Sequence, residues 1–167
     1  YPIKPNIAII GAGIFGMTTA SILGEKFKVT VFERHKDILT EASCANQYRH
    51  HQGYHYPRSP ETIKQIKEST TNFEEMYGKA IVKVPSYVAV ARNDSKITAD
   101  EFRQVCKDNN LVYKEEYPTD DFLNKDEVDT CIRTNEAIYD YNMLKELMKK
   151  GIENKNVSLK LEAEVKK

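Results

Sequence analysis

One unit near the start of this chain limits its fold more than any other feature. Four mostly β-branched residues, Ile7 to Ile10, predict a buried strand, and the small residues Gly11-Ala-Gly13 then turn the chain. The pattern predicts a helix over 14–26 and a second short strand over 28–32, which ends at Glu33. This order of strand, glycine-rich turn, helix and strand predicts a βαβ unit with a parallel sheet.

The small residues of the turn have separate expected roles. Gly11 permits the tight turn, Gly13 lets backbone approach a pyrophosphate, and Gly16 lets the helix press against the strand. The free N–H groups and positive dipole at the helix N-terminus favour an anion there. Glu33 follows the glycines by about 20 residues, where a carboxylate can accept the ribose hydroxyls of an adenosine. These features predict dinucleotide binding, and a glycine-rich turn in an unrelated fold is the alternative.

The composition argues against nucleic acid and membranes as partners. The chain has 167 residues with 25 basic and 25 acidic side chains, and no basic stripe that would hold nucleic acid or an anionic membrane. No apolar run is long enough for a membrane span. Cys44, Cys106 and Cys131 are far apart and odd in number, which argues against a disulfide framework. With no apolar signal segment among the first residues, we expect a cytoplasmic protein.

The segment from Arg34 to Ser59 lacks clear periodicity and contains all four histidines. Loops of this length inside compact domains are uncommon and usually functional. Four histidines suggest a metal, but no cysteine or carboxylate at ligand spacing completes a tetrahedral set, so we predict no metal site. Cys44 lies in the same loop without a cation or second cysteine to activate it, which favours a small buried residue over a redox thiol.

The middle of the chain predicts a small lobe. Ser59 can cap a helix that begins at Pro60 and ends at Gly78, and Thr98 with Glu101 forms a capping box for a helix to about residue 109. Three short segments have strand-like composition, the first two of them joined around Pro85-Ser86: 81–84, 87–91 and 111–114. We therefore expect an inserted antiparallel lobe.

The last third of the chain returns to βαβ character. It predicts a strand over 136–139, a helix that Asp140 caps and that stops near Gly151, and a strand over 157–161 that residues up to Val165 can extend. The expected domains are a nucleotide-binding segment with its loop, a small lobe, and a return to the nucleotide-binding domain: 1–78, 79–131 and 132–167.

Together these residues resemble the N-terminal part of an FAD-dependent oxidoreductase of the D-amino acid oxidase superfamily. Asn46 followed by His51-x-Gly53-x-x-Tyr56-Pro57 is similar to the L-2-hydroxyglutarate dehydrogenase/oxidase branch, although Tyr48 stands where that family usually has a glycine. Family members are considerably longer, so we expect a fragment that is incomplete for turnover. The resemblance rests on Gly11-Ala-Gly-Ile-Phe-Gly16, Phe32-Glu-Arg34, the segment Ala42 to Pro57, and Glu136-Ala-Ile-Tyr-Asp140 with the elements leading to Val165.

The resemblance implies an α/β fold: a Rossmann-like, FAD-binding parallel sheet with a small inserted antiparallel lobe on the substrate side. It places His51 near the flavin, or in some relatives at the covalent attachment point, and a histidine satisfied by loop hydrogen bonds stays an open alternative. It identifies no catalytic residue in this chain. The residues that it implies for cofactor binding are Gly11, Ala12, Gly13, Ile14, Phe15, Gly16, Glu33, Arg34, Ser43, Asn46, Gln47, His51 and Val165.

The implied activity is oxidation of a small 2-amino or 2-hydroxy acid by hydride transfer to FAD. An NAD-dependent enzyme, or a non-catalytic nucleotide-binding module that shares only the first βαβ unit, is the alternative. The carboxylate of Glu33 argues against NADP, because it would repel a 2′-phosphate. The sequence gives no indication of oligomeric state.

Overall fold

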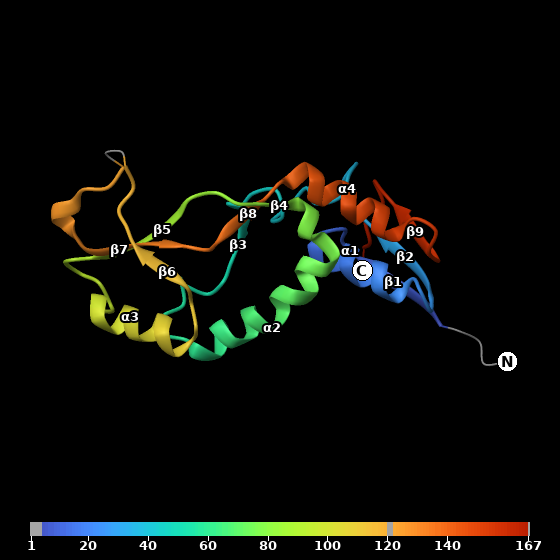
Figure 1. Ribbon diagram of the computed structural model, residues 1–167. Coiled ribbons are helices and arrows are strands. Elements are labelled where there is room, and N and C mark those ends of the chain that lie inside the picture. Colours follow the sequence, from blue (N-terminus) through green and yellow to red (C-terminus); the bar gives the residue numbers. More distant parts are fainter. Residues whose placement is uncertain (1–4, 120–121, 167) are drawn as a thin grey trace. The chain divides into compact units, whose positions relative to one another are not determined.

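The computed structural model describes residues 5–119 and 122–166, which divide into two compact units (Figure 1). The first unit contains both ends of the chain, up to Tyr48 and from Tyr139 onward, and the second contains Arg49–Ile138. The sequence predicted these boundaries near 78 and 132. The chain enters the second unit earlier because Tyr54 and Ile63 pack in that unit's hydrophobic core.

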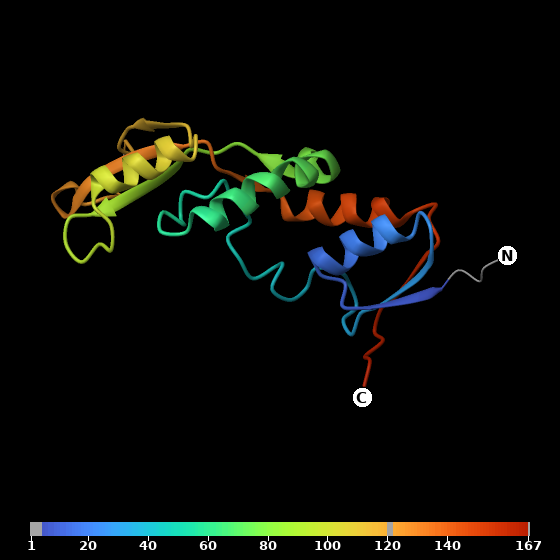
Figure 2. The same ribbon diagram turned by 90° about the horizontal axis from the view of Figure 1, so that it is seen from below.

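A three-stranded parallel sheet forms the centre of the first unit, in the order β1 (Asn6–Ile10), β2 (Lys28–Phe32) and β9 (Val157–Lys160). Helices α1 (Ile14–Leu23) and α4 (Tyr141–Ile152) lie on one side of this sheet (Figure 2). Alternate side chains of a strand point to opposite faces. In β1, Ile7 and Ile9 are half-buried and Ile10 is 72% exposed, so the expectation of a buried first strand is wrong. The predicted βαβ unit and parallel sheet are confirmed.

Hydrogen bonds hold the two helices of the first unit, one at the start of α4 and one between α1 and α4. Asp140 accepts a hydrogen bond from the Met143 N–H at 2.9 Å, which confirms the predicted cap of α4. The Ser21 hydroxyl on α1 donates to the Gly151 carbonyl on α4 at 2.7 Å. Helix α1 ends at Leu23, three residues earlier than predicted, because the chain turns at Gly24 to enter β2.

The predicted extension of the last strand to Val165 is wrong. Strand β9 ends at Lys160, and Glu162 has a left-handed backbone with φ of 53°. The Ala163 N–H then donates to the Glu33 carbonyl at 2.8 Å. The chain therefore leaves the sheet and follows the end of β2 as irregular backbone.

The described residues between 49 and 139 form two further three-stranded sheets. One has the order β3 (Arg49–His50), β8 (Ala137–Tyr139) and β4 (Ile81–Val82). The other is antiparallel, in the order β5 (Ser86–Ala91), β7 (Val128–Thr134) and β6 (Tyr113–Glu115). The expected antiparallel strands are therefore present. The first two predicted strands, however, belong to different sheets, and the central strand β7 was not predicted.

Helices α2 (Pro60–Tyr77) and α3 (Ala99–Asp108) complete the second unit, with single 3₁₀ turns at Gly78–Ala80 (η1) and Lys125–Glu127 (η2). The capping box of α3 is confirmed, but the expected Ser59 cap is wrong, because its hydroxyl contacts the Thr62 hydroxyl at 2.7 Å instead of a backbone N–H. Among the described residues no helix combines the length and apolarity that membrane crossing needs. The core of the unit consists of Tyr54, Ile63, Val90, Phe102, Cys106, Leu111 and Ile132.

Candidate functional site

A cavity of about 690 Å³ lies in the first unit at the carboxyl ends of β1 and β2. Ligands of open α/β sheets bind at this edge. Four segments form its wall: the glycine-rich turn with the start of α1, the end of β2, the following loop, and the irregular chain after β9. The lining residues are Ile10, Gly11, Gly13, Ile14, Phe15, Gly16, Phe32, Glu33, Arg34, Thr40, Glu41, Ala42, Ser43, Asn46, Ala163, Glu164 and Val165.

The fold itself requires glycine at two positions of the turn. Gly11 has φ of 97°, a conformation that residues with a Cβ rarely adopt, and its N–H donates to the Phe32 carbonyl at 2.8 Å. A Cβ on Gly16 would lie 2.0 Å from the Gly11 carbonyl oxygen. The close approach of α1 to the end of β1 therefore excludes any side chain at Gly16.

Gly13 differs, because the protein leaves space beside it. A Cβ there would have only the Ser43 Oγ nearby, at 3.8 Å. Gly13 is also the N-cap of α1, without a side-chain cap, and the first turn of the helix carries no acidic residue. The N–H groups that begin α1 are thus presented to the cavity without a competing side chain, which is the arrangement that binds a phosphate group.

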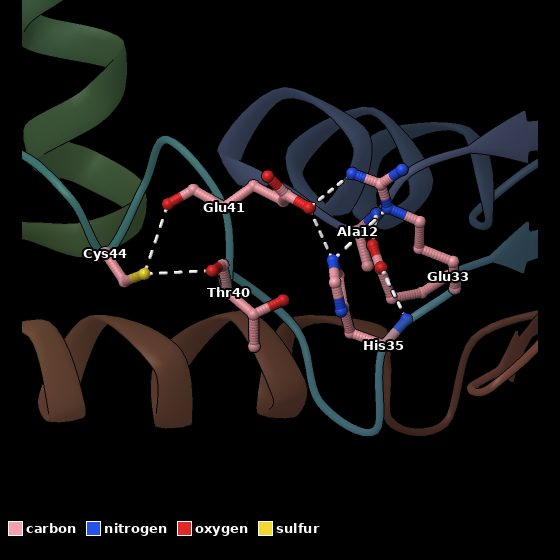
Figure 3. A network of polar contacts seen from close by, with 7 residues as sticks. Ala12, Glu33, His35, Thr40, Glu41 and Cys44 are labelled. Carbon is pink, nitrogen blue, oxygen red and sulfur yellow. Dashed lines mark hydrogen bonds and ion pairs between the residues drawn. The ribbon is translucent and has the colours of Figure 1, made fainter.

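Glu33 connects the end of β2 to the glycine-rich turn (Figure 3). Its side chain is buried with 7% exposure, Oε2 accepts the Ala12 N–H at 2.8 Å, and Oε1 accepts the His35 N–H at 2.9 Å. An ionised carboxylate has about four acceptor positions, so two bonds leave capacity for ligand hydroxyls. Glu33 is therefore a cavity residue that also holds the turn, a second role that the sequence analysis missed.

Arg34 lies at the exposed rim of the cavity, where Glu41 holds it. The Glu41 Oε1 accepts from the Arg34 guanidinium and lies 2.5 Å from the His35 Nε2 (Figure 3). Hydrogen bonds from His35 and Arg34 keep the pKa of Glu41 below its usual value. Sequence reasoning missed Glu41, because a charge pair seven residues apart in an irregular loop leaves no periodic signal.

The loop that follows β2 supplies polar groups to the cavity wall. Ser43 and Asn46 line it as predicted, and so does Thr40, whose buried Oγ1 has no hydrogen-bond partner among the described residues. The half-buried Cys44 thiol donates to the carbonyls of Thr40 at 3.0 Å and Glu41 at 3.1 Å (Figure 3). Three predicted cofactor residues stand apart from the wall: Ala12, which is buried in the turn, Gln47, which is exposed, and His51.

The same loop is anchored to α4 by contacts that the sequence did not reveal. Asp37 accepts from Lys145 at 2.9 Å and from Lys149 at 2.7 Å. Burial of Asp37 opposes ionisation, but the hydrogen bonds from Lys149 and Lys145 outweigh it and hold the pKa of Asp37 well below its usual range. The Tyr141 hydroxyl also donates to the Leu39 carbonyl at 2.9 Å. Helix α4 thus fixes the outer wall of the cavity.

His51 belongs to the second unit, in a cluster around a buried ion pair. Glu136 is 2% exposed, pairs with Arg49, and accepts the Gln52 N–H at 3.0 Å. The His51 Nδ1 is buried and has no hydrogen-bond partner among the described residues. Burial lowers the pKa of both His51 and His55. Within 5–119 and 122–166, no group of three or more histidine, cysteine or acidic side chains is arranged to hold a metal.

The parallel sheet, the glycine-rich turn and the cavity at the strand ends define a dinucleotide-binding domain. The family model described as FAD dependent oxidoreductase (DAO) matches residues 6–163 of this chain. The chain therefore belongs to the DAO family of FAD-dependent oxidoreductases, an enzyme family whose cofactor is FAD. The predicted membership of the D-amino acid oxidase superfamily is confirmed.

Individual relatives extend the comparison. Over 115 residues, 68% of this chain and 31% of the relative, the sequence is 32% identical to the FAD-dependent monooxygenase FPY4 of Fusarium mangiferae. The L-alpha-glycerophosphate oxidase of Mycoplasma pneumoniae, solved with FAD bound, has a TM-score of 0.71 at 18% identity, over 96% of this chain and 45% of its own. Glycine oxidase of Geobacillus kaustophilus has a TM-score of 0.72 at 14% identity, over 95% of this chain and 47% of its own. The chain spans less than half of each of these proteins, and the solved structures confirm the α/β fold.

Proposed function

We propose that the cavity of the first unit binds the pyrophosphate and adenosine parts of FAD. The observation that carries the proposal is the position of Glu33, a buried carboxylate on the cavity wall that is hydrogen-bonded to Ala12 in the glycine-rich turn. This bond fixes the distance between a phosphate site at the start of α1 and a ribose site at the end of β2. The N-terminus of α1 has no side-chain cap, and the Thr40 hydroxyl has no hydrogen-bond partner in the described part of the chain. Both features fit a ligand with phosphate oxygens.

Each wall residue then has a role in holding the cofactor. The N–H groups that follow Gly13 donate to the pyrophosphate, and the Ser43 hydroxyl lies beside them. The remaining acceptor positions of Glu33 receive the ribose hydroxyls, while Arg34 packs against the adenine side. Val165 is a proposed cofactor contact on the wall of the same cavity. Gln47 and His51 remain proposed contacts of the ribitol and flavin end.

The whole protein is proposed to oxidise a small 2-amino or 2-hydroxy acid. FAD, when bound, supplies the acceptor for the substrate's hydride, and the protein supplies binding and orientation. Glycine oxidase among the solved structures supports an amino acid. The pattern of Asn46 with His51-x-Gly53-x-x-Tyr56-Pro57 supports L-2-hydroxyglutarate. We further propose that residues 79–131 form the lobe on the substrate side, that residues 1–78 and 132–167 form the FAD-binding part, and that the protein is cytoplasmic.

Monooxygenation is a second candidate reaction. It is favoured by the Fusarium relative, which is named an FAD-dependent monooxygenase. The two reactions differ in the fate of O₂, since an oxidase reduces it to hydrogen peroxide and puts no oxygen atom from O₂ into the organic product. Turnover of the whole protein under ¹⁸O₂ separates them: label in the organic product supports monooxygenation, and hydrogen peroxide with unlabelled product supports oxidation.

Titration of the purified chain with FAD, ADP and NAD tests the binding proposal. We expect FAD to bind with a shift of its visible absorption bands, and ADP to compete with it, because both share the adenosine and pyrophosphate groups. Tighter binding of NAD than of FAD, or no binding of any of the three, would contradict the proposal. For substrate, anaerobic bleaching of the whole protein's flavin by glycine or by L-2-hydroxyglutarate distinguishes the two acids.

A further inference from the structure

Tyr48 adopts a backbone conformation that is unfavourable for a residue with its size of side chain. Its φ is 52°, in the left-handed region that glycine, asparagine and aspartate adopt most readily. A residue stays in such a conformation only when its surroundings compensate for the cost, and such residues concentrate at functional sites. The side chain of Tyr48 should therefore provide interactions that a glycine could not.

The structure shows these interactions on both sides of the residue. The Tyr48 ring packs against the rings of Tyr139 and Tyr141, with centroid distances of 6.1 Å and 5.5 Å. The Tyr48 hydroxyl donates to the Cys44 carbonyl at 2.7 Å. In addition, the Tyr48 carbonyl accepts the Tyr139 N–H at 2.8 Å. Tyr48 thus connects the loop that follows β2 to Tyr139, just before α4, and to Tyr141, the first residue of α4.

Two hydrogen bonds of Asn46 also close the chain between Ala42 and Tyr48 into a compact turn. The Asn46 Oδ1 accepts the Tyr48 N–H at 2.7 Å, and the Asn46 Nδ2 donates to the Ala42 carbonyl at 2.9 Å. Ser43 lies inside this turn, directly before the carbonyl that the Tyr48 hydroxyl holds. Ser43 lines the cavity, and its hydroxyl lies beside Gly13, the N-cap of α1.

We propose that Tyr48 is a positioning residue for dinucleotide binding, which acts by holding Ser43 over the start of α1. The inference rests on the proposed function, since it takes the cavity as the pyrophosphate site. Tyr48 itself does not line the cavity. Its hydroxyl fixes the Cys44 carbonyl, the rings of Tyr139 and Tyr141 fix the aromatic side chain, and Ser43 is thereby held where its hydroxyl can donate to a phosphate oxygen.

Binding of FAD and of ADP to the Tyr48→Phe variant tests the proposal. This variant keeps the ring and loses only the bond to Cys44, so we expect the Kd for both ligands to rise about threefold to tenfold, the range for one hydrogen bond. Tyr48→Gly relieves the left-handed strain but removes ring and hydroxyl, and should bind more weakly still. Tyr87→Phe is the matched control, because it removes a tyrosine hydroxyl bonded to Glu116 in the second unit and should leave both Kd values unchanged.

A double-mutant cycle with Ser43→Ala shows whether the effect passes through Ser43. If it does, Tyr48→Phe weakens binding in the wild-type background and adds little in the Ser43→Ala background. Additive effects, or a Tyr48→Phe variant that binds both ligands like the wild type at a temperature where each protein is folded, overturn the inference. A wild-type chain that binds neither FAD nor ADP instead overturns the proposed function on which the inference rests.

Discussion

The Glu33 carboxylate accepts the Ala12 N–H at 2.8 Å, although the two residues are 21 positions apart in the chain. This bond joins the end of β2 to the turn between β1 and α1, the two places where a dinucleotide would be held. The bond therefore joins the proposed ribose-binding and phosphate-binding parts of the cavity, and one substitution should disturb both.

Glu33→Ala should lower both stability and ligand affinity. It removes the acceptor for the Ala12 and His35 N–H groups. It also removes the carboxylate that we propose accepts the ribose hydroxyls. A buried donor left unpaired costs about 1–3 kcal/mol, so the free energy of unfolding should fall by about 2 kcal/mol and ADP affinity by about tenfold or more. Chemical denaturation and ADP titration measure the two effects.

Glu164→Ala is the control for this prediction, because Glu164 is an exposed acid on the same cavity wall. It should change stability by less than about 0.5 kcal/mol, as exposed substitutions usually do. If Glu33→Ala binds ADP as tightly as the wild type, Glu33 has only a structural role in the turn.

Gly13 and Gly16 should respond oppositely to substitution. Gly13→Asp places a good N-cap at the start of an uncapped helix, so stability should change by less than about 0.5 kcal/mol. The same charge would face the pyrophosphate and abolish dinucleotide binding. Gly16→Ala would force a Cβ to within 2.0 Å of the Gly11 carbonyl and should destabilise the chain by about 2 kcal/mol or more.

Gly13→Asn separates charge from size in this experiment. Asparagine caps a helix about as well as aspartate but carries no charge, so it should retain more affinity for FAD than Gly13→Asp does. Thermal unfolding and FAD titration of the three variants are the measurements. Wild-type affinity in Gly13→Asp would show that the phosphate lies elsewhere.

The sequence predicted those features that depend on neighbours along the chain. The glycine-rich turn, the strands that flank α1, and the caps supplied by Thr98 and Asp140 are local patterns, and each is confirmed. The central strand β7 was missed because its exposed Asp129 and Arg133 interrupt the run of apolar residues that marks a strand. The supposed extension to Val165 failed because the Ala163 N–H bonds to the Glu33 carbonyl instead of to a neighbouring strand.

In the candidate site, too, local patterns were predicted and contacts made by irregular loops were missed. Glycine spacing and the acid at the end of β2 located the cavity, whereas the ion pairs of Glu41 and Asp37 left no signal because they join residues of irregular loops to each other or to α4. Tyr48 was noted only as a departure from the family's glycine. Its left-handed backbone and its bond to Cys44 became visible only in three dimensions.

Asp37→Asn should destabilise the first unit in a pH-dependent manner. Because Lys149 and Lys145 hold the pKa of Asp37 below its usual value of about 4, the ionised form stabilises the folded chain above that pH. The stabilisation is lost as the pH falls below about 4 towards the lowered pKa of the folded state. At pH 7 we expect a loss of about 1–2 kcal/mol.

Urea unfolding at pH 7 and at pH 3 measures this difference. The gap between wild type and Asp37→Asn should be narrower at pH 3. Asp94→Asn is the control, since Asp94 is exposed in the second unit and asparagine tolerates its φ of 57°. An equal gap at both pH values would show that the lysine contacts do not depend on the charge of Asp37.

His51 is predicted to lie at the flavin and not at a metal. Elemental analysis of the purified protein should find no stoichiometric zinc, iron or copper, and a bound metal that disappears when His51 and His55 are replaced would refute this. In the whole protein, His51→Ala should alter the flavin absorption spectrum or its rate of reduction. An unchanged spectrum and rate would reduce His51 to a structural loop residue.

The protonation of His51 gives a second, independent test. Burial lowers the pKa of His51 in the folded chain, so the unfolded chain binds its proton more readily. Stability contributed by the neutral imidazole should therefore decline as the pH falls through the ordinary histidine pKa of about 6.5. His51→Gln should make the free energy of unfolding less dependent on pH between 7 and 5 than in the wild type. His35→Gln, which changes a histidine of the first unit that contacts Glu41, provides the comparison. An unaltered pH dependence in His51→Gln would show that the His51 imidazole does not control this transition.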